Sequence, residues 1–425
     1  MSDVMTNLLE KTPIAYDAIQ ALRDMAFEAD HLETEAERLP ARKALALYET
    51  QLRDLNERAL APNLLHEGST LAPALEFLDD RSHRLEVIMA WQRSDGKSRA
   101  NSGNRRLVGW LVVHRAHAFA GFGLSYFKNW HHLYSYMGHP IVDRDNANAA
   151  LSALFDQALA KAGAPGRLLM SNVPGSGPIY DAIVRVSHNK KLLIHEIGRH
   201  QRAAMITDLN GEEYLKSALS AKKRKEFRRL KNRLGDLGEL KFESWQAGDN
   251  IVPWVEDFMN LEIAGWKGRK QTAFNNRQDW AEFLKASTTN LAESGHCKIW
   301  RLRLDDRTIA ITIAHHAGHQ GWLTKIAYDE TYAKYSPGVL LVLEVTRRIA
   351  DDPLITEFDS LAIPDHPMIN HLWRERISTT DLLLGTQQAG AKTGFRLTYK
   401  LIEARREFRA RAKAIYYRYL KGARK

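Results

Sequence analysis

The segment 328–341, YDETYAKYSPGVLL, constrains the fold of this 425-residue chain most strongly. It runs from a strand pattern through a polar turn into a helix that starts at Ser336-Pro337-Gly338. The first turn of a helix leaves backbone N–H groups without partners, and the helix dipole adds positive potential, so such a start can bind a phosphate. Ser336 suits the N-cap, Pro337 suits the first helical position, and Gly338 permits close approach of a ligand. The same pattern can also start a purely structural helix.

Three strand patterns precede this segment. They are KIWRLRL at 298–304, TIAITIAHH at 308–316 and GWLTKIAY at 321–328, and polar turns separate them. Strands joined by short turns pair in antiparallel order. The sequence therefore predicts a three-stranded meander that leads directly into a helix able to bind phosphate.

Five blocks, in this order, resemble the GNAT-type acyltransferase domain of the cellulose-biosynthesis-protein class of bacterial acetyltransferases. The resemblance spans about 207 to about 380. That family is similar to the Fem-type aminoacyl-tRNA-dependent transferases, which build one active site from two GNAT-like halves. The blocks are AKKRKEFRR at 221–229, EIAGWKG at 262–268, AYDE at 327–330, SPG at 336–338 and EFD at 357–359.

The resemblance implies an acyl-CoA-dependent N-acyltransferase. An acyl-CoA, or the thioester of an acyl carrier protein, would be a co-substrate and not a permanently bound cofactor. Two alternatives stay open: an aminoacyl-tRNA-dependent transferase of the Fem type, and a non-catalytic GNAT-like binding protein. The residues expected to bind the donor are Tyr328, Ser336, Pro337, Gly338 and Val339.

Amide formation from a thioester needs a neutral amine, a path for its proton and a donor to the carbonyl oxygen. Glu262, Trp266 and Lys267 lie near the end of a predicted helix at 253–265, so they can border one cleft. Glu262 would act as the base or bind the ammonium of the acceptor, and Lys267 would pair with a phosphate, a carboxylate or Glu262. An exposed salt bridge is the alternative; the resemblance favours the catalytic role, with Trp266 binding substrate.

Further candidates lie in the strands and loops that follow. Side chains alternate along a strand, so at most one of His315 and His316 meets the substrate, and we take His316 as the catalytic candidate. Asp329 follows the strand expected to line the thioester, although Asp is also an ordinary turn residue. Asp359 and His366 occupy the region where GNAT enzymes recruit a general acid, and they are candidate substrate-binding residues; His366 can equally be a constraint on its loop.

Cysteine usage bears on the reaction route and on the cell compartment. Cys297 is the only cysteine, so no intrachain disulfide can form and a reducing compartment is expected. Nothing in the sequence marks this thiol as reactive, which favours direct attack by the acceptor over a covalent intermediate. We find no metal-binding motif and no nucleophile elbow in the sequence.

Positive charge is concentrated in two runs, at 222–233 and at 396–425, which suggests an anionic partner. In the first run, Leu219, Phe227 and Leu230 recur at helical spacing, so an amphipathic helix with an outward cationic face is expected. Aromatic residues accompany the second run, which suits an anionic membrane surface, RNA or a docking helix. We favour the membrane over tRNA, because no RNA-binding motif accompanies this run; an acidic acyl carrier protein is a further candidate partner. The acceptor is expected to be a small amine, a sugar or a lipid-like molecule.

The expected fold class is α/β (α+β), with tandem GNAT-like halves and an N-terminal helical hairpin. The first half has no Ser-Pro-Gly equivalent, so we expect it to lack the donor and to shape the acceptor cleft. The first residues show no leader pattern, which predicts a cytoplasmic protein, with peripheral attachment to the inner membrane face as an option. The expected division is 1–63 (helical), 64–206 (first half), 207–395 (second half) and 396–425 (basic C-terminal helix).

Overall fold

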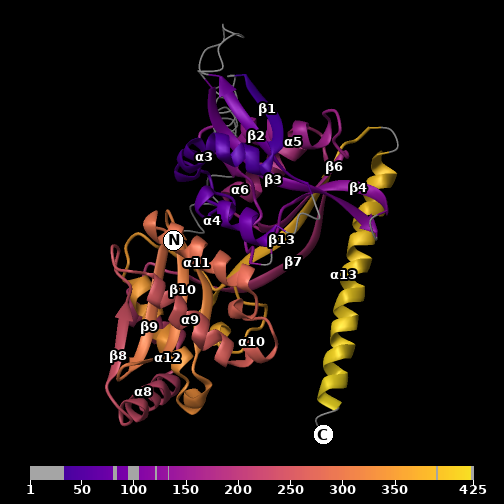
Figure 1. Ribbon diagram of the computed structural model, residues 1–425. Helices are drawn as coiled ribbons and strands as arrows, with labels where there is room; N and C mark the ends of the chain where they lie inside the picture. The colour runs from indigo at the N-terminus through magenta and orange to yellow at the C-terminus, as the bar shows by residue number, and fades with distance from the viewer. Residues whose placement is uncertain are drawn as a thin grey trace, which may run out of the picture.

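The computed structural model describes residues 33–79, 84–93, 105–119, 122–132, 134–388 and 391–422. They form two α/β halves, with the first half in indigo to magenta and the second in orange (Figure 1). The elements of the first half are β1 (Thr34–Pro40), α3 (Ala41–Glu57), α4 (Gly68–Pro73), η1 (Ala74–Leu78), β2 (Leu85–Arg93), β3 (Arg105–Phe119), β4 (Phe122–Asn129), β5 (Ile141–Val142), α5 (Ala147–Leu159), β6 (Arg167–Pro174), α6 (Pro178–Asn189) and β7 (Leu193–Ile206).

The second half repeats this order of elements. A three-stranded meander, a helix and a further strand follow one another in both halves, which confirms the predicted tandem α/β architecture. The elements are α7 (Gly211–Ala218), α8 (Ala221–Gly235), β8 (Leu240–Ser244), α9 (Val252–Ala264), α10 (Trp266–Arg269), η2 (Phe274–Asn276), α11 (Gln278–Glu293), β9 (Cys297–Leu304), β10 (Arg307–Ala317), β11 (Gln320–Tyr328), η3 (Glu330–Tyr335), α12 (Pro337–Ala350), β12 (Glu357–Asp359), η4 (Ile369–His371), β13 (Glu375–Gly385) and α13 (Ala391–Gly422).

One sheet runs through both halves, because each half gives its last strand to the other. The strand order in the described chain is β1-β2-β3-β4-β6-β13-β7-β12-β11-β10-β9-β8. The short strand β5 pairs with β3 outside this order. β13, the last strand of the second half, pairs with β6 of the first. β7, the last strand of the first half, pairs with β12 of the second. In Figure 1 these two strands cross the boundary between the halves. The fixed relation of the halves therefore rests on backbone hydrogen bonds.

The apolar core also crosses this boundary. On one face of the sheet, Leu52 of α3 and Leu71 of α4 belong to the same buried cluster as Phe258 of α9 and Leu291 of α11. On the opposite face, α12 packs Leu341 against the strands of the second half. Burial of apolar area is the main favourable term in folding, so this shared cluster holds the halves together.

The N-terminal part of the first half differs from its prediction. Only helices are expected before residue 63, yet Thr34–Pro40 forms an edge strand that pairs antiparallel with β2. Its sequence, TEAERLP, has no clear alternation of apolar residues. Ion pairs to β2 and to the next strand, β3, hold it instead: Arg93 of β2 contacts Glu35 at 2.9 Å, and Arg105 of β3 contacts Glu37 at 2.9 Å. β1 and α3 therefore belong to the first half, and the rest of the predicted hairpin, in residues 1–32, lies outside the described residues.

The C-terminal helix α13 begins at Ala391, five residues before the predicted start. It contacts the sheet as far as Arg406, which pairs with Asp381 and donates to the Ile197 carbonyl at 2.8 Å. Phe395 and Ile402 are buried against β3, β7 and β13. From Ala404 to Lys413 the side chains are exposed, and Phe408 is 74% exposed. This part of the helix projects away from the first half (Figure 1). In the part of the chain that the structure describes, no helix is both long and apolar enough to span a membrane.

Candidate functional site

The sheet of the second half opens between β11 and β12. The two strands pair in parallel for three residues only, from Gln320 opposite Glu357 to Trp322 opposite Asp359. From Leu323 to Tyr328, none of the described strands pairs with this edge of β11. A strand edge without a neighbour presents backbone N–H and C=O groups to an extended ligand. The opening can therefore bind a long, flexible molecule along β11.

A bulge in β11 marks the inner end of this opening. Ile313 of β10 lies opposite Lys325, whereas the next residue, Ala314, lies opposite Leu323, so Thr324 is an extra residue in β11. Its hydroxyl donates to the Ile313 carbonyl at 2.8 Å. Bulges bend a strand and redirect its side chains, and they are common next to functional sites. Here the bulge lies where β11 has just left β12.

The helix that starts at Ser336-Pro337-Gly338 lies at the other end of the opening. Ser336 is the N-cap residue of α12, as predicted, but it has left-handed backbone angles, φ 56° and ψ 50°, and its side chain makes no capping hydrogen bond. The carbonyl of Ser336 instead accepts from Val339 N at 3.0 Å. A Cβ on Gly338 would lie 3.2 Å from the Tyr328 ring, so a larger residue here would press on that ring.

The cationic helix α8 lies beside this helix start. Leu230 and Leu234 are buried and its basic side chains are mostly exposed, which confirms the predicted amphipathic helix. α8 contacts η3, the turn that ends just before Ser336, and Arg233 lies 5.9 Å from the centre of the Tyr335 ring. The region around the start of α12 is therefore positively charged.

A cavity of about 200 Å³, the junction cavity, lies between the two halves, and the bulge residue Thr324 forms part of its wall. Aromatic and aliphatic side chains form most of its wall, and several hydroxyl groups and two basic residues complete it. Residues from both halves contribute, so neither half forms it alone. Its lining is Leu65, Thr70, Tyr134, Ser135, Tyr136, Phe274, Phe283, Leu284, Ser287, Thr288, Ile313, His315, Thr324, Lys325 and Leu361.

Tyr134 and Lys325 dominate the polar character of this cavity. The Tyr134 ring stacks on Phe274 at 4.1 Å and on Phe283 at 5.7 Å between ring centres. The amine of Lys325 lies 5.0 Å from the centre of the Tyr134 ring and 5.2 Å from that of Phe274. Burial lowers the pKa of Lys325 to about 8, and the nearby charge of Lys267 acts in the same direction. This amine can therefore exchange a proton near neutral pH.

His315, and not the predicted His316, lines the cavity. The Tyr136 hydroxyl and His315 Nδ1 lie 2.9 Å apart, which joins the first half to β10. Burial lowers the pKa of His315 to about 3, so the ring is neutral. Strand alternation turns the His316 side chain to the other face of the sheet, where its ring lies 6.3 Å from the ring of His296. The expectation that only one of the pair faces the site is met, but the choice of His316 is not supported.

Glu262 and Lys267 form a largely buried ion pair and not an exposed one. Glu262 is 3% exposed; its Oε1 accepts from Lys267 Nζ at 2.8 Å and its Oε2 accepts from Phe274 N at 2.8 Å. Lys267 Nζ also lies 3.4 Å from the Ile326 carbonyl of β11. Both carboxylate oxygens are thus occupied. The pair links α9, α10, η2 and β11 beside the cavity. Glu262 therefore positions the elements around the cavity and has no free oxygen for a substrate.

We expect Glu262→Ala to lower the free energy of unfolding by about 2 kcal/mol. The change would leave Lys267 without its carboxylate and the Phe274 N–H without an acceptor. Glu262→Gln should cost less, because its carbonyl oxygen can still accept one hydrogen bond. Urea unfolding of both variants checks this. Glu262→Ala combined with Lys267→Met should recover part of the loss, and unchanged stability of Glu262→Ala would contradict the buried pair.

The predicted residues Trp266 and Asp329 lie outside the cavity. Trp266 begins α10, and Asp329 lies between β11 and η3. Asp329 accepts from Thr331 N at 2.9 Å and from Arg307 at 2.6 Å, so it caps η3 as a turn residue. Trp266 is 47% exposed, and its backbone N–H donates to Glu330 Oε1 at 2.7 Å. Both residues therefore fix the turn that leads to α12.

Asp359 and His366 also have local partners. Asp359 is 2% exposed, pairs with the buried Arg202 of β7, and accepts from Leu361 N at 2.9 Å. It thus links the two halves at the point where β12 ends. His366 Nδ1 accepts from Met368 N at 3.3 Å, which constrains its loop. Neither side chain lines the junction cavity.

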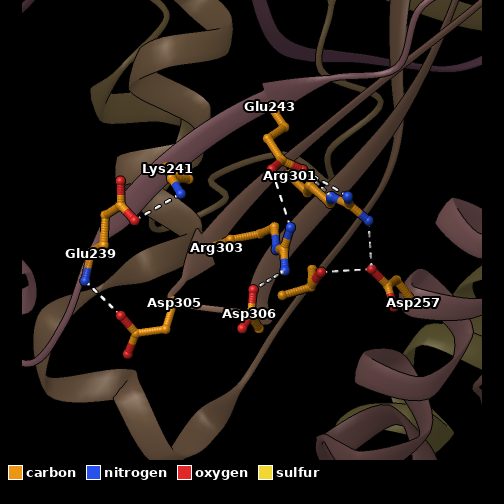
Figure 2. Close-up of polar contacts among 9 residues, drawn as sticks. Glu239, Lys241, Glu243, Asp257, Arg301, Arg303, Asp305 and Asp306 are labelled. Atoms are coloured by element: carbon orange, nitrogen blue, oxygen red, sulfur yellow. Dashed lines mark hydrogen bonds and ion pairs between the residues drawn. The ribbon is translucent and has the colours of Figure 1, made fainter.

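A larger cleft, of about 900 Å³, lies beside α9 and the outer ends of β9 and β10. Figure 2 shows Arg301 and Arg303 of this cleft already paired with carboxylates. The other two arginines that line it are paired as well, Arg269 with Glu330 and Arg307 with Asp329. Arg301 contacts Glu243 at 2.7 Å and Asp257 at 3.0 Å, and Arg303 contacts Glu243 at 3.3 Å. Because carboxylates already neutralise these arginines, this cleft is a poor phosphate site despite its size.

The corresponding opening in the first half is filled by the chain itself. β4 pairs with β6 in parallel for two residues only. Beyond them, the Asn129 side chain donates to the carbonyls of Gly138 at 2.8 Å and Ser171 at 2.9 Å. A Cβ on Gly138 would lie only 1.8 Å from the Ser171 carbonyl oxygen, so the returning chain packs tightly here. A long ligand therefore has room in the second half and not in the first.

Sequence reasoning missed three of the residues that meet in the cavity. Lys325 carries a signal, because it is a charged residue inside an otherwise apolar strand pattern. Tyr134 and Tyr136 carry none, because they lie in an irregular segment of the first half and reach the second half only through the tertiary fold.

Residues 221–366 match the family model described as an acetyltransferase (GNAT) domain. No curated protein matches the chain significantly. This match supports a GNAT-like fold for the second half, and the order of the elements in that half agrees with it. The fold class predicted from the sequence, with tandem GNAT-like halves, is therefore confirmed, apart from the N-terminal hairpin.

Three solved structures are similar to this chain over most of its length, and one of them, FemX, reaches a TM-score of 0.50. The crystal structure of FemX covers 78% of this chain and 95% of its own, with a TM-score of 0.50 at 11% identity. The C-terminal domain of a putative lysylphosphatidylglycerol synthetase from Agrobacterium fabrum covers 84% and 96%, with a TM-score of 0.47 at 12% identity. A tandem GNAT protein from the clavulanic acid biosynthesis pathway covers 82% and 98%, with a TM-score of 0.37 at 14% identity. At these identities the likeness to FemX concerns the fold alone.

Proposed function

We propose that this protein is an acyltransferase that moves an acyl group from a CoA-type thioester to an amine in the junction cavity. The observation that carries the proposal is the separation of β11 from β12 with a bulge at Thr324, where the opening meets the cavity. An extended pantetheine-like arm along β11 would bring its thioester to this bulge. The acyl carbonyl and the acceptor would then meet at one point.

The charge at the far end of the opening suits the phosphates of such a donor. The start of α12 supplies the positive end of a helix dipole, and α8 adds exposed basic side chains nearby. Tyr328 and Val339 are half-buried beside this start. The donor can be an acyl-CoA or an acyl carrier protein, which share the phosphopantetheine arm. The first half has no open counterpart, and we infer that it shapes the acceptor side.

Direct attack within a ternary complex fits the described residues better than a covalent route. Cys297 is buried, and burial raises the pKa of its thiol to about 12. A thiol that stays protonated at neutral pH is a poor nucleophile. Cys297 also does not line the junction cavity.

Hydrogen exchange tests the placement of the donor. We expect added CoA to slow exchange of the amides in 323–340, and to leave those in 122–146 unchanged, because the opening exists only in the second half. Protection of 122–146, or of neither region, would contradict the placement.

Several finer assignments stay predictions. They include membership of the cellulose-biosynthesis class, the acyl chain length and the identity of the acceptor. An aminoacyl-tRNA donor, a non-catalytic role and attachment of the projecting part of α13 to an anionic membrane are the alternatives that experiments would reveal. Binding that is lost steeply as salt rises would indicate a nucleic-acid partner.

A further inference from the structure

The amine of Lys325 is enclosed without a counter-charge. Among the described residues, its nitrogen takes part in no ion pair and no hydrogen bond, and its neighbours are the faces of Tyr134 and Phe274. The nearest carboxylate in the cavity region, that of Glu262, is already held by Lys267 and by a backbone N–H. An enclosed ammonium without a carboxylate partner is costly, so Lys325 adds little to stability.

The position of Lys325 links it to the reacting atoms. It directly follows Thr324, the bulge residue, and both line the junction cavity. The titratable groups around it are Lys267 on α10 and Glu262 on α9, which pair with each other, and Tyr134, Tyr136 and His315 in the cavity wall. His315 is neutral and bound to Tyr136. Lys325 is therefore the one cavity-lining group in the described chain that can take up a proton near neutral pH.

We propose that Lys325 is the proton acceptor for the attacking amine, and that the junction cavity takes a primary amine on a compact apolar or aromatic body. The proposal rests on the proposed acyl transfer and names its acceptor class. Aromatic faces attract an arriving ammonium, and the aliphatic walls suit an apolar body. The volume of about 200 Å³ limits the acceptor to a small molecule or to the end of a longer one.

The reaction then proceeds in balanced steps. The acceptor ammonium gives one proton to the neutral amine of Lys325. The freed nitrogen lone pair attacks the thioester carbon, a C–N bond forms, and the carbonyl electrons move to oxygen. When the carbonyl reforms, the C–S bond breaks with its electron pair on sulfur. The second proton of the nitrogen passes to the sulfur, which gives an amide and a free thiol. Lys325 returns its proton to solvent.

A first experiment measures Lys325 without any acceptor. Brief labelling with acetic anhydride across pH 6–11, read by mass spectrometry, should show Lys325 reacting with a midpoint near pH 8. A free lysine derivative labelled in the same solution is the reference and should react with a midpoint near the usual ~10.4. Equal midpoints for Lys325 and the reference would overturn the proposal. Lys325→Met should be folded and should melt at a higher temperature than wild type at pH 7. The pKa of Lys325 is lowered on folding, so this difference should shrink as the pH rises from about 8 towards 10.

A second experiment follows transfer, using acetyl-CoA with 2-phenylethylamine, tyramine and n-hexylamine as probe acceptors and release of the free thiol as the readout. Wild type should turn over at least one probe, with a rate that rises to a plateau above about pH 8. Lys325→Arg keeps the positive charge but cannot accept a proton, so it should bind CoA normally and lose at least a hundredfold in rate. A wild-type rate in Lys325→Arg, or no turnover of any probe by a wild type that binds CoA, would overturn the proposal. Failure of CoA to bind would instead contradict the proposed function.

Discussion

Ser336→Asp should weaken CoA binding about a hundredfold, whereas Ser336→Asn should bind nearly as wild type does. Ser336 has left-handed backbone angles, which Asp and Asn tolerate better than most residues. A carboxylate at this position would occupy the positive end of α12 and repel the phosphates of the donor. Each tenfold loss corresponds to about 1.4 kcal/mol, so the expected cost is near 3 kcal/mol.

The same pair of variants separates binding from folding. The carboxylate of Ser336→Asp should stabilise α12 slightly, by about 0.3–1 kcal/mol, because it faces the helix dipole favourably. A variant that is at least as stable as wild type but fails to bind CoA would place the phosphates at this helix start. Equal CoA affinity of the Asp and Asn variants would contradict that placement. Gly338 is a poorer test, because any side chain there meets the Tyr328 ring.

We expect the protein to lose its stability steeply between pH 6.5 and 4. Burial lowers the pKa of His66, His132 and His315 to about 3, and that of His131 and His139 to about 4. The unfolded chain takes up these protons below its ordinary pKa of about 6.5, whereas the folded protein does not. A tenfold change in a protonation equilibrium on folding is worth about 1.4 kcal/mol, so a few such histidines together can exceed the stability of an ordinary domain, about 5–15 kcal/mol.

Two of these histidines, His132 and His315, lie where the halves meet, so the transition should also report on the junction. The His132 ring lies 5.3 Å from Phe283 of α11, and His315 Nδ1 lies 2.9 Å from the Tyr136 hydroxyl. Urea unfolding at pH 7.5, 6.5, 5.5 and 4.5 checks the prediction. His132→Phe, which keeps the aromatic contact without the titrating group, should show a shallower loss. Stability that is flat down to pH 4.5 would contradict the assignment of these rings as buried and neutral.

The parts of the fold that depend on local sequence pattern were predictable. The three strands before α12 lie within one residue of the ranges expected from their apolar runs, and α8 buries the face that its spacing indicates. The edge strand β1 was not, because ion pairs to its neighbours replace the apolar alternation that identifies a strand. The exchange of β7 and β13 between the halves depends on pairing over long sequence separations, which has no local signature.

The candidate site was predictable in outline but not in its residues. The region from β11 to α12 was identified, yet Asp329 caps a turn there and Gly338 accommodates a ring. His315 and His316 are adjacent, and only the register of β10 decides which one faces the cavity. Lys325 acquires its surroundings from Tyr134, nearly two hundred residues away in the sequence, so its role follows from the tertiary structure alone.

Calorimetric titration with CoA, acetyl-CoA and palmitoyl-CoA, at two salt concentrations, tests the central claim most directly. We expect one CoA per chain, with an affinity that survives the higher salt, because the opening along β11 contributes contacts beyond charge. The preferred chain length would then indicate the donor. No binding, or binding that disappears at the higher salt, would contradict the claim that the opening between β11 and β12 holds a CoA-type donor.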